Sequence, residues 1–198
     1  MNRERRELLR DAAVDVLAQA GGRGLTHRAV DAVAGVPLGT AKNYFPTRDA
    51  LLRAVAERCL ERCRERADAL AEAGPTDRAG VAALLAALLR ELAGPGRPRV
   101  LAYLELLTEG ARRPWLAALL DPIAAADFAA HARLLRPLGA AGSAERARAL
   151  TLALHGALPH LLVAGPGTLA AAGLDDLDGF ARDVLDAVCP GAPTEHAP

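Results

Sequence analysis

The chain has 198 residues, with 24 basic and 24 acidic side chains, and 52% of its residues are hydrophobic but only 3% aromatic. This length and composition suit one or two packed domains and exclude a disordered or fibrous chain. Alanine and leucine supply 46 and 34 residues, whereas residues that favour strands are scarce, so we expect an all-α fold.

The N-terminal third is the basic end of the chain. Residues 1–66 hold 13 basic and 9 acidic side chains, and residues 67–198 hold 11 basic and 15 acidic ones. The first ten residues contain four Arg and two Glu without an apolar core, which is not the pattern of a secretory signal. We therefore expect a cytoplasmic protein whose three cysteines are free thiols.

Four helices are expected in the first third. The first spans about residues 4–20 and ends at Gly21. A short second helix follows the cap Thr26 and ends at the next glycine turn, and a short third helix lies at about 38–44. Thr47 then caps a long fourth helix with one apolar stripe.

A Gly-Pro pair at 74–75 separates these helices from the remainder of the chain. Residues 149–174 contain no charged side chain, but internal proline and glycine residues make a buried helix a better interpretation than a membrane span. The tail at 190–198 is proline-rich, and we expect it to be disordered. Apolar periodicity predicts further helices at about 81–92, 99–111, 114–136, 144–163 and 175–188.

Two short helices joined by a glycine-containing turn are typical of a helix-turn-helix, whose second helix enters the major groove of DNA. The second helix here has a polar surface formed by Thr40, Lys42, Asn43 and Tyr44. Hydroxyls, amides and cations are the groups that bind phosphate oxygens and base edges, and Gly39 allows the backbone to approach a phosphate.

About the first 55 residues resemble the N-terminal domain of the TetR family of bacterial transcriptional regulators. The remainder is similar only in being helical and of suitable length. The resemblance is carried by residues 6–13, Gly24-Leu25-Thr26, Ala34-Gly35-Val36, Gly39-Thr40 and the run Asn43-Tyr44-Phe45-Pro46-Thr47-Arg48-Asp49-Ala50-Leu51-Leu52.

The resemblance implies a DNA-binding domain at 1–48 and a regulatory and dimerisation domain at 49–189. It implies a repressor that binds a palindromic operator in double-stranded DNA as a homodimer, with recognition helices about 34–36 Å apart, and that a small-molecule effector releases. The DNA-contacting residues would be Thr26, His27, Arg28, Pro37, Leu38, Gly39, Thr40, Lys42, Asn43, Tyr44 and Arg48.

Several of these residues have a second interpretation. Thr26 caps a helix in any case, and Tyr44 can pack against the first helix. Arg48 opposes the dipole of the fourth helix, for which an external phosphate would be a reason. Three positions depart from the family pattern. Pro37 replaces a common Ser or Thr cap, Lys42 replaces a tyrosine and can reach the same phosphate, and Asp31 has no role that the sequence explains.

By resemblance, the effector site lies in the regulatory domain. The polar and aromatic residues available there are Tyr103, Trp115, Phe128 and His131, although each is also an ordinary core residue. Scarce charge predicts an apolar or weakly polar ligand. Apolar stripes on the last two long helices predict a dimer interface formed by Leu154, Leu158, Leu161, Leu162, Phe180, Val184 and Val188.

No catalytic motif, metal site or cofactor site is expected. Cys59 and Cys63 lie on an apolar helix stripe, where cysteine behaves as a small hydrophobe rather than as a thiol sensor. His155 and His160 are five residues apart with no Cys or carboxylate nearby in sequence, which favours satisfied or interface histidines.

Glu105 and Glu109 share a helical face and are expected to be solvated or to pair with Arg112 or Arg113. The alternatives to a regulator are a helical enzyme or ligand carrier that does not bind DNA, and a helical protein-protein adaptor. Salt-dependent binding to duplex DNA separates the regulator from both.

Overall fold

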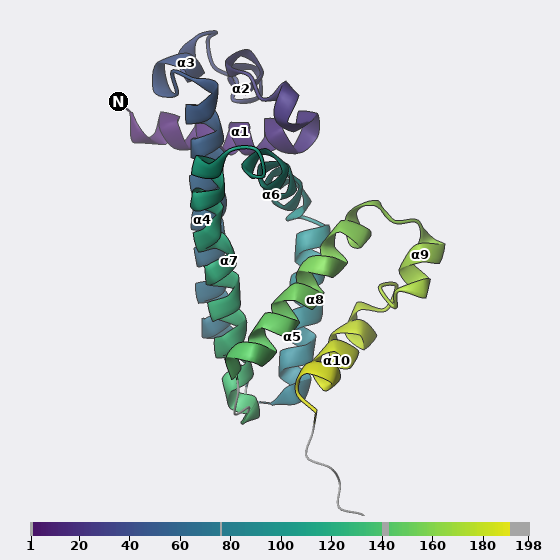
Figure 1. Ribbon diagram of the computed structural model, residues 1–198. Helices are drawn as coiled ribbons and strands as arrows, with labels where there is room; N and C mark the ends of the chain where they lie inside the picture. Colours follow the sequence, from purple (N-terminus) through teal and green to yellow (C-terminus); the bar gives the residue numbers. More distant parts are fainter. Residues whose placement is uncertain (1, 76, 140–142, 191–198) are drawn as a thin grey trace, which may run out of the picture. The chain divides into compact units, whose positions relative to one another are not determined.

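The computed structural model describes residues 2–75, 77–139 and 143–190, which form ten α-helices, one short 3-10 turn and no strand (Figure 1). The all-α expectation is therefore confirmed for the described part of the chain. The helices are α1 (Arg3–Gly24), α2 (His27–Val33), α3 (Thr40–Tyr44), α4 (Arg48–Ala73), α5 (Arg78–Ala93), α6 (Arg97–Gly110), α7 (Pro114–Leu135), α8 (Ser143–Val163), α9 (Pro166–Ala171) and α10 (Leu177–Val188), with the 3-10 turn at Arg136–Leu138.

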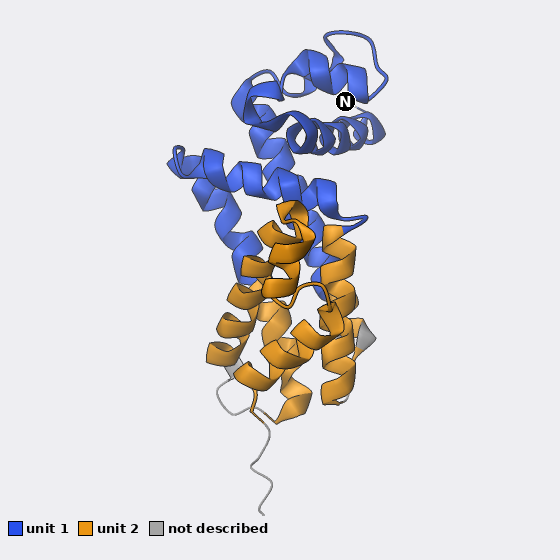
Figure 2. Ribbon diagram, turned by 90° about the vertical axis from the view of Figure 1, so that its right-hand side faces the viewer, with its two compact units in different colours: residues 1–67, 94–126 blue, residues 68–93, 127–198 orange. Residues whose placement is uncertain are grey.

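The chain forms two compact units (Figure 2). Unit 1 comprises residues 1–67 and 94–126, and unit 2 comprises residues 68–93 and 127–198. Two of the three boundaries fall inside α4 and α7, so each of these helices contributes to both units, and the third falls between α5 and α6. The functional division of the chain after residue 48 stays a prediction.

In unit 1, the N-terminal helices begin and end near the capping and glycine residues that the sequence predicts. The backbone leaves helical geometry at Gly21, whose φ of 64° is left-handed and favours glycine, and one further turn continues to Gly24. The Thr26 hydroxyl accepts a hydrogen bond from the Ala29 amide at 3.2 Å, and the Thr47 hydroxyl accepts one from the Ala50 amide at 3.1 Å. Both predicted helix caps are confirmed.

The core of unit 1 joins α1 to the start of α4 and to α6 and α7. Leu9 and Leu17 of α1 pack with Leu51 of α4 and Leu106 of α6, and all four side chains are fully buried. Burial of this kind stabilises the fold by about 1.5–3 kcal/mol for each side chain. The three N-terminal helices are thereby fixed to α4 and α6.

Unit 2 is built around α5, α8 and α10. Leu85 and Leu89 of α5 pack with Leu150 of α8 and Leu185 of α10. The Arg78 guanidinium at the start of α5 donates hydrogen bonds to the Leu185 carbonyl, which lies in the last turn of α10, and to the side-chain carboxylate of Asp186.

The uncharged run at 149–174 is not one buried helix, so that expectation is wrong. Helix α8 ends at Val163, and α9 begins at Pro166 after the exposed Gly165. The break has a simple cause, because a proline has no amide hydrogen to continue a helix but fits well in a first helical turn. Most of α9 is exposed. Among the described residues, no single helix is both long and apolar enough to cross a membrane.

Candidate nucleic-acid interface and effector region

Helices α2 and α3 pack against each other and are joined by a six-residue connection at 34–39. Two glycines set the path of this turn, Gly35 with φ 62° and Gly39 with φ 90°. A Cβ atom at either glycine would meet open space, so the backbone conformation rather than crowding requires glycine there. Gly39 is also exposed, directly before the first turn of α3.

The buried carboxylate of Asp31 holds α3 in place. The side chain is 1% exposed, and it accepts hydrogen bonds from the Gly39 amide at 2.7 Å and from the Ala41 amide at 2.6 Å. These amides are among the groups at the start of a helix that lack partners within it. Asp31 therefore caps α3 from the neighbouring helix, which explains how Pro37 can replace a hydroxyl-bearing cap.

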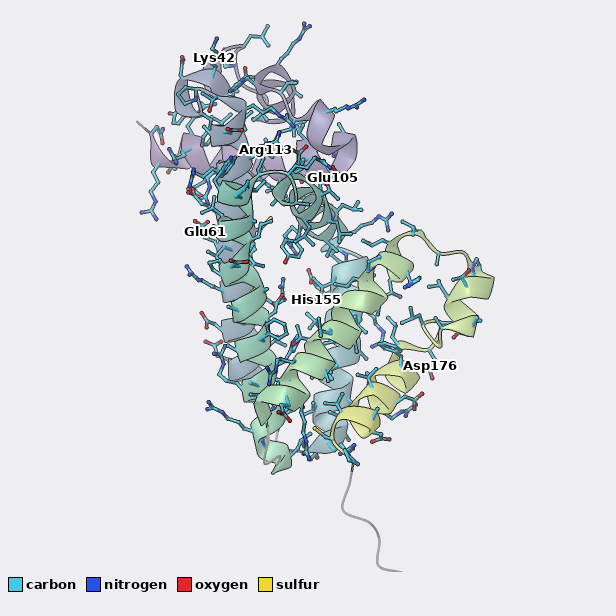
Figure 3. The ribbon with its side chains drawn as sticks, in the orientation of Figure 1. Lys42, Glu61, Glu105, Arg113, His155 and Asp176 are labelled. Atoms are coloured by element: carbon cyan, nitrogen blue, oxygen red, sulfur yellow. The ribbon has the colours of Figure 1, made fainter. Side chains whose placement is uncertain are left out.

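The outer side of the helix-turn-helix carries polar side chains. Arg28, Lys42 and Asn43 are exposed, and Figure 3 shows Lys42 at the end of unit 1 formed by α2 and α3. The Thr40 hydroxyl donates to the Pro37 carbonyl at 2.6 Å. Leu38 is 74% exposed, although it is a large apolar residue. This combination offers a cation, an amide and an apolar group to a partner in the same small area.

Three other predicted contact residues have partners within unit 1. The Nε2 of His27 lies 2.5 Å from the Phe45 carbonyl, which links the start of α2 to the end of α3. Tyr44 is half-buried against the core of unit 1, in line with its alternative interpretation. The Arg48 guanidinium donates to the carbonyls of Gly22 at 2.6 Å and Leu25 at 2.9 Å. The position of Arg48 thus has an internal reason.

Helix α6 also contacts the turn between α1 and α2. The Glu105 carboxylate accepts a hydrogen bond from the Gly22 amide at 3.0 Å, and Glu109 lies 3.5 Å from the Arg48 guanidinium. Glu109 also forms an ion pair with Arg113, one of the two arginines that the sequence offered as its partner. The link to Gly22 was not predicted, because the two residues are 83 positions apart.

An ion-pair cluster joins α1 to α4. The Arg58 guanidinium donates to both oxygens of Asp11, at 2.7 and 2.8 Å, and Arg10 donates to Glu61 at 2.8 Å. The hydrogen bonds to Asp11 raise the pKa of Arg58 although partial burial opposes them. Burial acts to raise the pKa of Glu61, but hydrogen bonds from Arg10 and Arg58 outweigh it and lower that pKa.

A cavity in unit 1 lies beside this cluster. Its volume is about 110 Å³, which is smaller than the roughly 300 Å³ of a site for a drug-sized ligand. Burial raises the pKa of the Cys59 thiol in its wall to about 12, while Arg66 and Arg99 act to lower it. The cavity is lined by Asp11, Val14, Asp15, Arg58, Cys59, Arg62 and Arg99. Its size makes it a poor candidate for the effector site.

The four predicted effector-site residues divide between the two units. Tyr103 and Trp115 pack against the core of unit 1, and the Arg53 guanidinium lies 5.2 Å from the centre of the Trp115 ring. Phe128 and His131 belong to unit 2, where Phe128 is half-buried and His131 is 4% exposed. Their role as effector contacts stays a prediction.

Unit 2 contains one pairing that the sequence did not predict. His155 of α8 lies 3.2 Å from the carboxylate of Asp127 on α7, and Figure 3 labels His155. The expectation that His155 is a satisfied histidine is confirmed, but the carboxylate was missed because it lies 28 residues earlier. Within the described ranges, no group of His, Cys, Asp and Glu residues is arranged to hold a metal ion.

The predicted dimer residues lie largely inside unit 2. Leu154 and Leu162 are buried, at 3% and 6% exposure. The other five are half-buried in the described structure, where they pack against the core of the unit. The large apolar residues of α8 that are exposed are instead Leu152 and Val163, at 63% and 80% exposure.

Comparison with known proteins places this architecture among helix-turn-helix transcriptional regulators. Residues 76–191 match the family model described as the tetracyclin repressor-like C-terminal domain. The structure of the multidrug binding protein EbrR with imidazole is 32% identical, covering 98% of this chain and 94% of that chain, with a TM-score of 0.66. Its complex with proflavin is 31% identical over 93% of this chain and 99% of that chain, with a TM-score of 0.62.

EbrR structures with ethidium and malachite green match as well. A TetR family member from Streptomyces coelicolor A3 is 31% identical, covering 95% of this chain and 99% of that chain, with a TM-score of 0.67. No curated protein matches the chain. These matches show that the chain belongs to the TetR family of transcriptional regulators, which confirms the resemblance drawn from its first 55 residues.

Proposed function

We propose that this regulator is a repressor that binds a palindromic operator through α2 and α3 and that a small molecule releases. The observation that carries the proposal is α3 itself, a helix of five residues whose backbone is capped by buried Asp31 while Lys42 and Asn43 are exposed. A polar helix held in this way suits insertion into the major groove.

The exposed side chains divide by chemistry. Lys42 and Arg28 are cations suited to phosphate oxygens, which position a protein on DNA without reading its sequence. The Asn43 amide can make two hydrogen bonds to an adenine edge, and exposed Leu38 can contact a thymine methyl group. Arg48, whose hydrogen bonds hold the α1–α2 turn, is assigned to positioning the helix-turn-helix.

A palindromic operator requires two copies of the chain. We propose that the exposed face of α8 around Leu152 and Val163 forms the centre of the dimer interface, because large apolar side chains at 63% and 80% exposure favour contact with a second copy. The half-buried side chains on α10, such as Val184, would border this face. A dimer would set the spacing of the two α3 helices at about one turn of DNA.

We propose a lipophilic aromatic cation as the effector, acting on the repressor in the cytoplasm. Support comes from EbrR, which is about a third identical and has been solved with proflavin, ethidium and malachite green. This class is more polar than the apolar or weakly polar ligand expected from composition alone. Such an effector releases DNA only if it binds the DNA-incompetent state of the dimer more tightly.

The decisive experiment is selection of duplex DNA from a random pool, followed by measurement of affinity against salt concentration. We expect a palindrome and a steep loss of affinity with salt. Lys42→Ala should weaken binding to every sequence and reduce the salt slope by about one. Arg112→Ala removes an exposed cation from the turn between α6 and α7 and serves as the control. Failure to bind duplex DNA at low salt would favour a helical enzyme or carrier instead.

A further inference from the structure

The first turn of α1 carries three cations. Arg3, Arg5 and Arg6 follow the cap residue Asn2, whose side chain accepts a hydrogen bond from the Arg5 amide at 3.4 Å. Arg3 and Arg5 are exposed, and Arg6 is half-buried. Positive charge opposes the dipole at the start of a helix, so the stability of α1 itself gives no reason for three arginines at this place.

Arg6 links this turn to the helix that we assign to the major groove. Its guanidinium lies over the Phe45 ring, 5.2 Å from the ring centre, and Phe45 directly follows Tyr44, the last residue of α3. Figure 1 shows the start of α1 near α3. Exposed Lys42 and Asn43 are within three residues of this ring. A contact with the face of the ring uses no N–H group, so the donors of the guanidinium are left for another partner.

Arg3 and Arg6 are neighbours on the surface of α1, because residues three apart lie on the same side of a helix. In the part of the chain that the structure describes, neither guanidinium forms an ion pair. Glu7 pairs instead with two other arginines, on α1 and α4, and Glu4 is exposed. The surface beside the end of α3 therefore carries two cations that the fold does not compensate.

We propose that Arg6 and Arg3 bind phosphates of the operator at the edge of the groove that receives α3, with Arg6 as the principal contact. The inference rests on the proposed function, in which α2 and α3 bind DNA. The first residues of a recognition helix approach the base edges, so a cation beside its last residue faces the backbone that borders the groove. The ring of Phe45 orders the Arg6 guanidinium before DNA binds, and paired guanidinium donors match phosphate oxygens.

The test measures affinity for the selected operator at several salt concentrations. Arg6→Gln and Arg3→Gln should each reduce the slope of log affinity against log salt by about 0.9, and the double variant should reduce it by about 1.8. Arg6→Lys keeps the charge and should keep the slope. Arg64→Gln is the matched control, because Arg64 is exposed on α4 about 24 Å along the helix from Arg48, and it should leave the slope unchanged.

Operators in which single phosphates are replaced by uncharged methylphosphonates locate the contact. One replacement at the groove edge should weaken binding of the unchanged chain but not of Arg6→Gln, and urea unfolding verifies that each variant is folded. Equal losses for Arg6→Gln and Arg6→Lys with an unchanged slope would show that Arg6 only supports Phe45, which overturns the inference. Full affinity and slope in the double variant overturn it as well. A chain that binds no duplex DNA at low salt overturns the proposed function together with the inference.

Discussion

Replacing Asp31 should release α3 while leaving the remainder of unit 1 folded. In Asp31→Ala, the amides of Gly39 and Ala41 lose the carboxylate to which they donate at 2.7 and 2.6 Å. Hydrogen bonds to a charged group contribute about 1.5–3 kcal/mol each. The site is 1% exposed, so water replaces the carboxylate poorly, and we expect the free energy of unfolding to fall by about 3 kcal/mol.

Asp31→Asn gives an intermediate result, because one amide oxygen remains as an acceptor while the NH₂ group faces a second donor. Urea unfolding measures the stability of each variant, and operator binding measures the placement of α3. Pro37→Ser in the Asp31→Ala background should recover part of the loss, because a serine hydroxyl two residues before Gly39, the N-cap of α3, can accept a hydrogen bond from the Gly39 amide. The same serine in the unchanged chain should have little effect, since Asp31 already occupies both amides.

The control is Asp121→Ala, which removes an exposed carboxylate from α7. If Asp31→Ala unfolds within about 0.5 kcal/mol of the unchanged chain and binds the operator equally well, the capping argument is refuted, since surface substitutions produce changes of that size.

Three further predictions follow from packing and exposure. In Gly22→Ala, the new Cβ would clash with the Glu109 carboxylate and displace it from Arg48 and Arg113, so urea unfolding should show a loss of about 1 kcal/mol. The loss should be smaller in a Glu109→Ala background, and independent effects of the two changes would contradict this reasoning. The Cys59 thiol, with its pKa raised to about 12, should resist a thiol reagent at neutral pH in the folded chain and react in urea; rapid labelling without urea would show that the site opens. If the proposed dimer forms through α8, Leu152→Arg should give a monomer in sedimentation while preserving helix content, and a dimer of unchanged affinity would place the interface elsewhere.

Local features of the sequence predicted most helices well. The caps Thr26 and Thr47 and the turn at Gly21 were identified from residue type and position, because each acts within a few residues of itself. The short helix α9 was missed, since its six residues, one of them a glycine, carry too little periodicity to distinguish a helix from a loop.

The site residues illustrate the opposite case. Asp31 binds amides eight and ten residues away across a turn, and its role depends on how α2 lies against α3. Arg48 and Asp127 likewise have partners 26 and 28 positions distant. Sequence periodicity shows which face of a helix is polar, but it does not show which other helix meets that face.

The attachment of α3 has a consequence for how operator preference can change. Asp31 binds the backbone amides of Gly39 and Ala41 and no side chain of α3, and a five-residue helix has little stability of its own. Substitutions at exposed Lys42 or Asn43 therefore leave the hydrogen bonds from Asp31 intact. Ala41, at 0% exposure, cannot be replaced by a larger side chain without a clash. Under the proposed function, a substitution at Asn43 would change the preferred operator sequence and one at Lys42 would change affinity for every sequence, in both cases without loss of the contacts that hold α3.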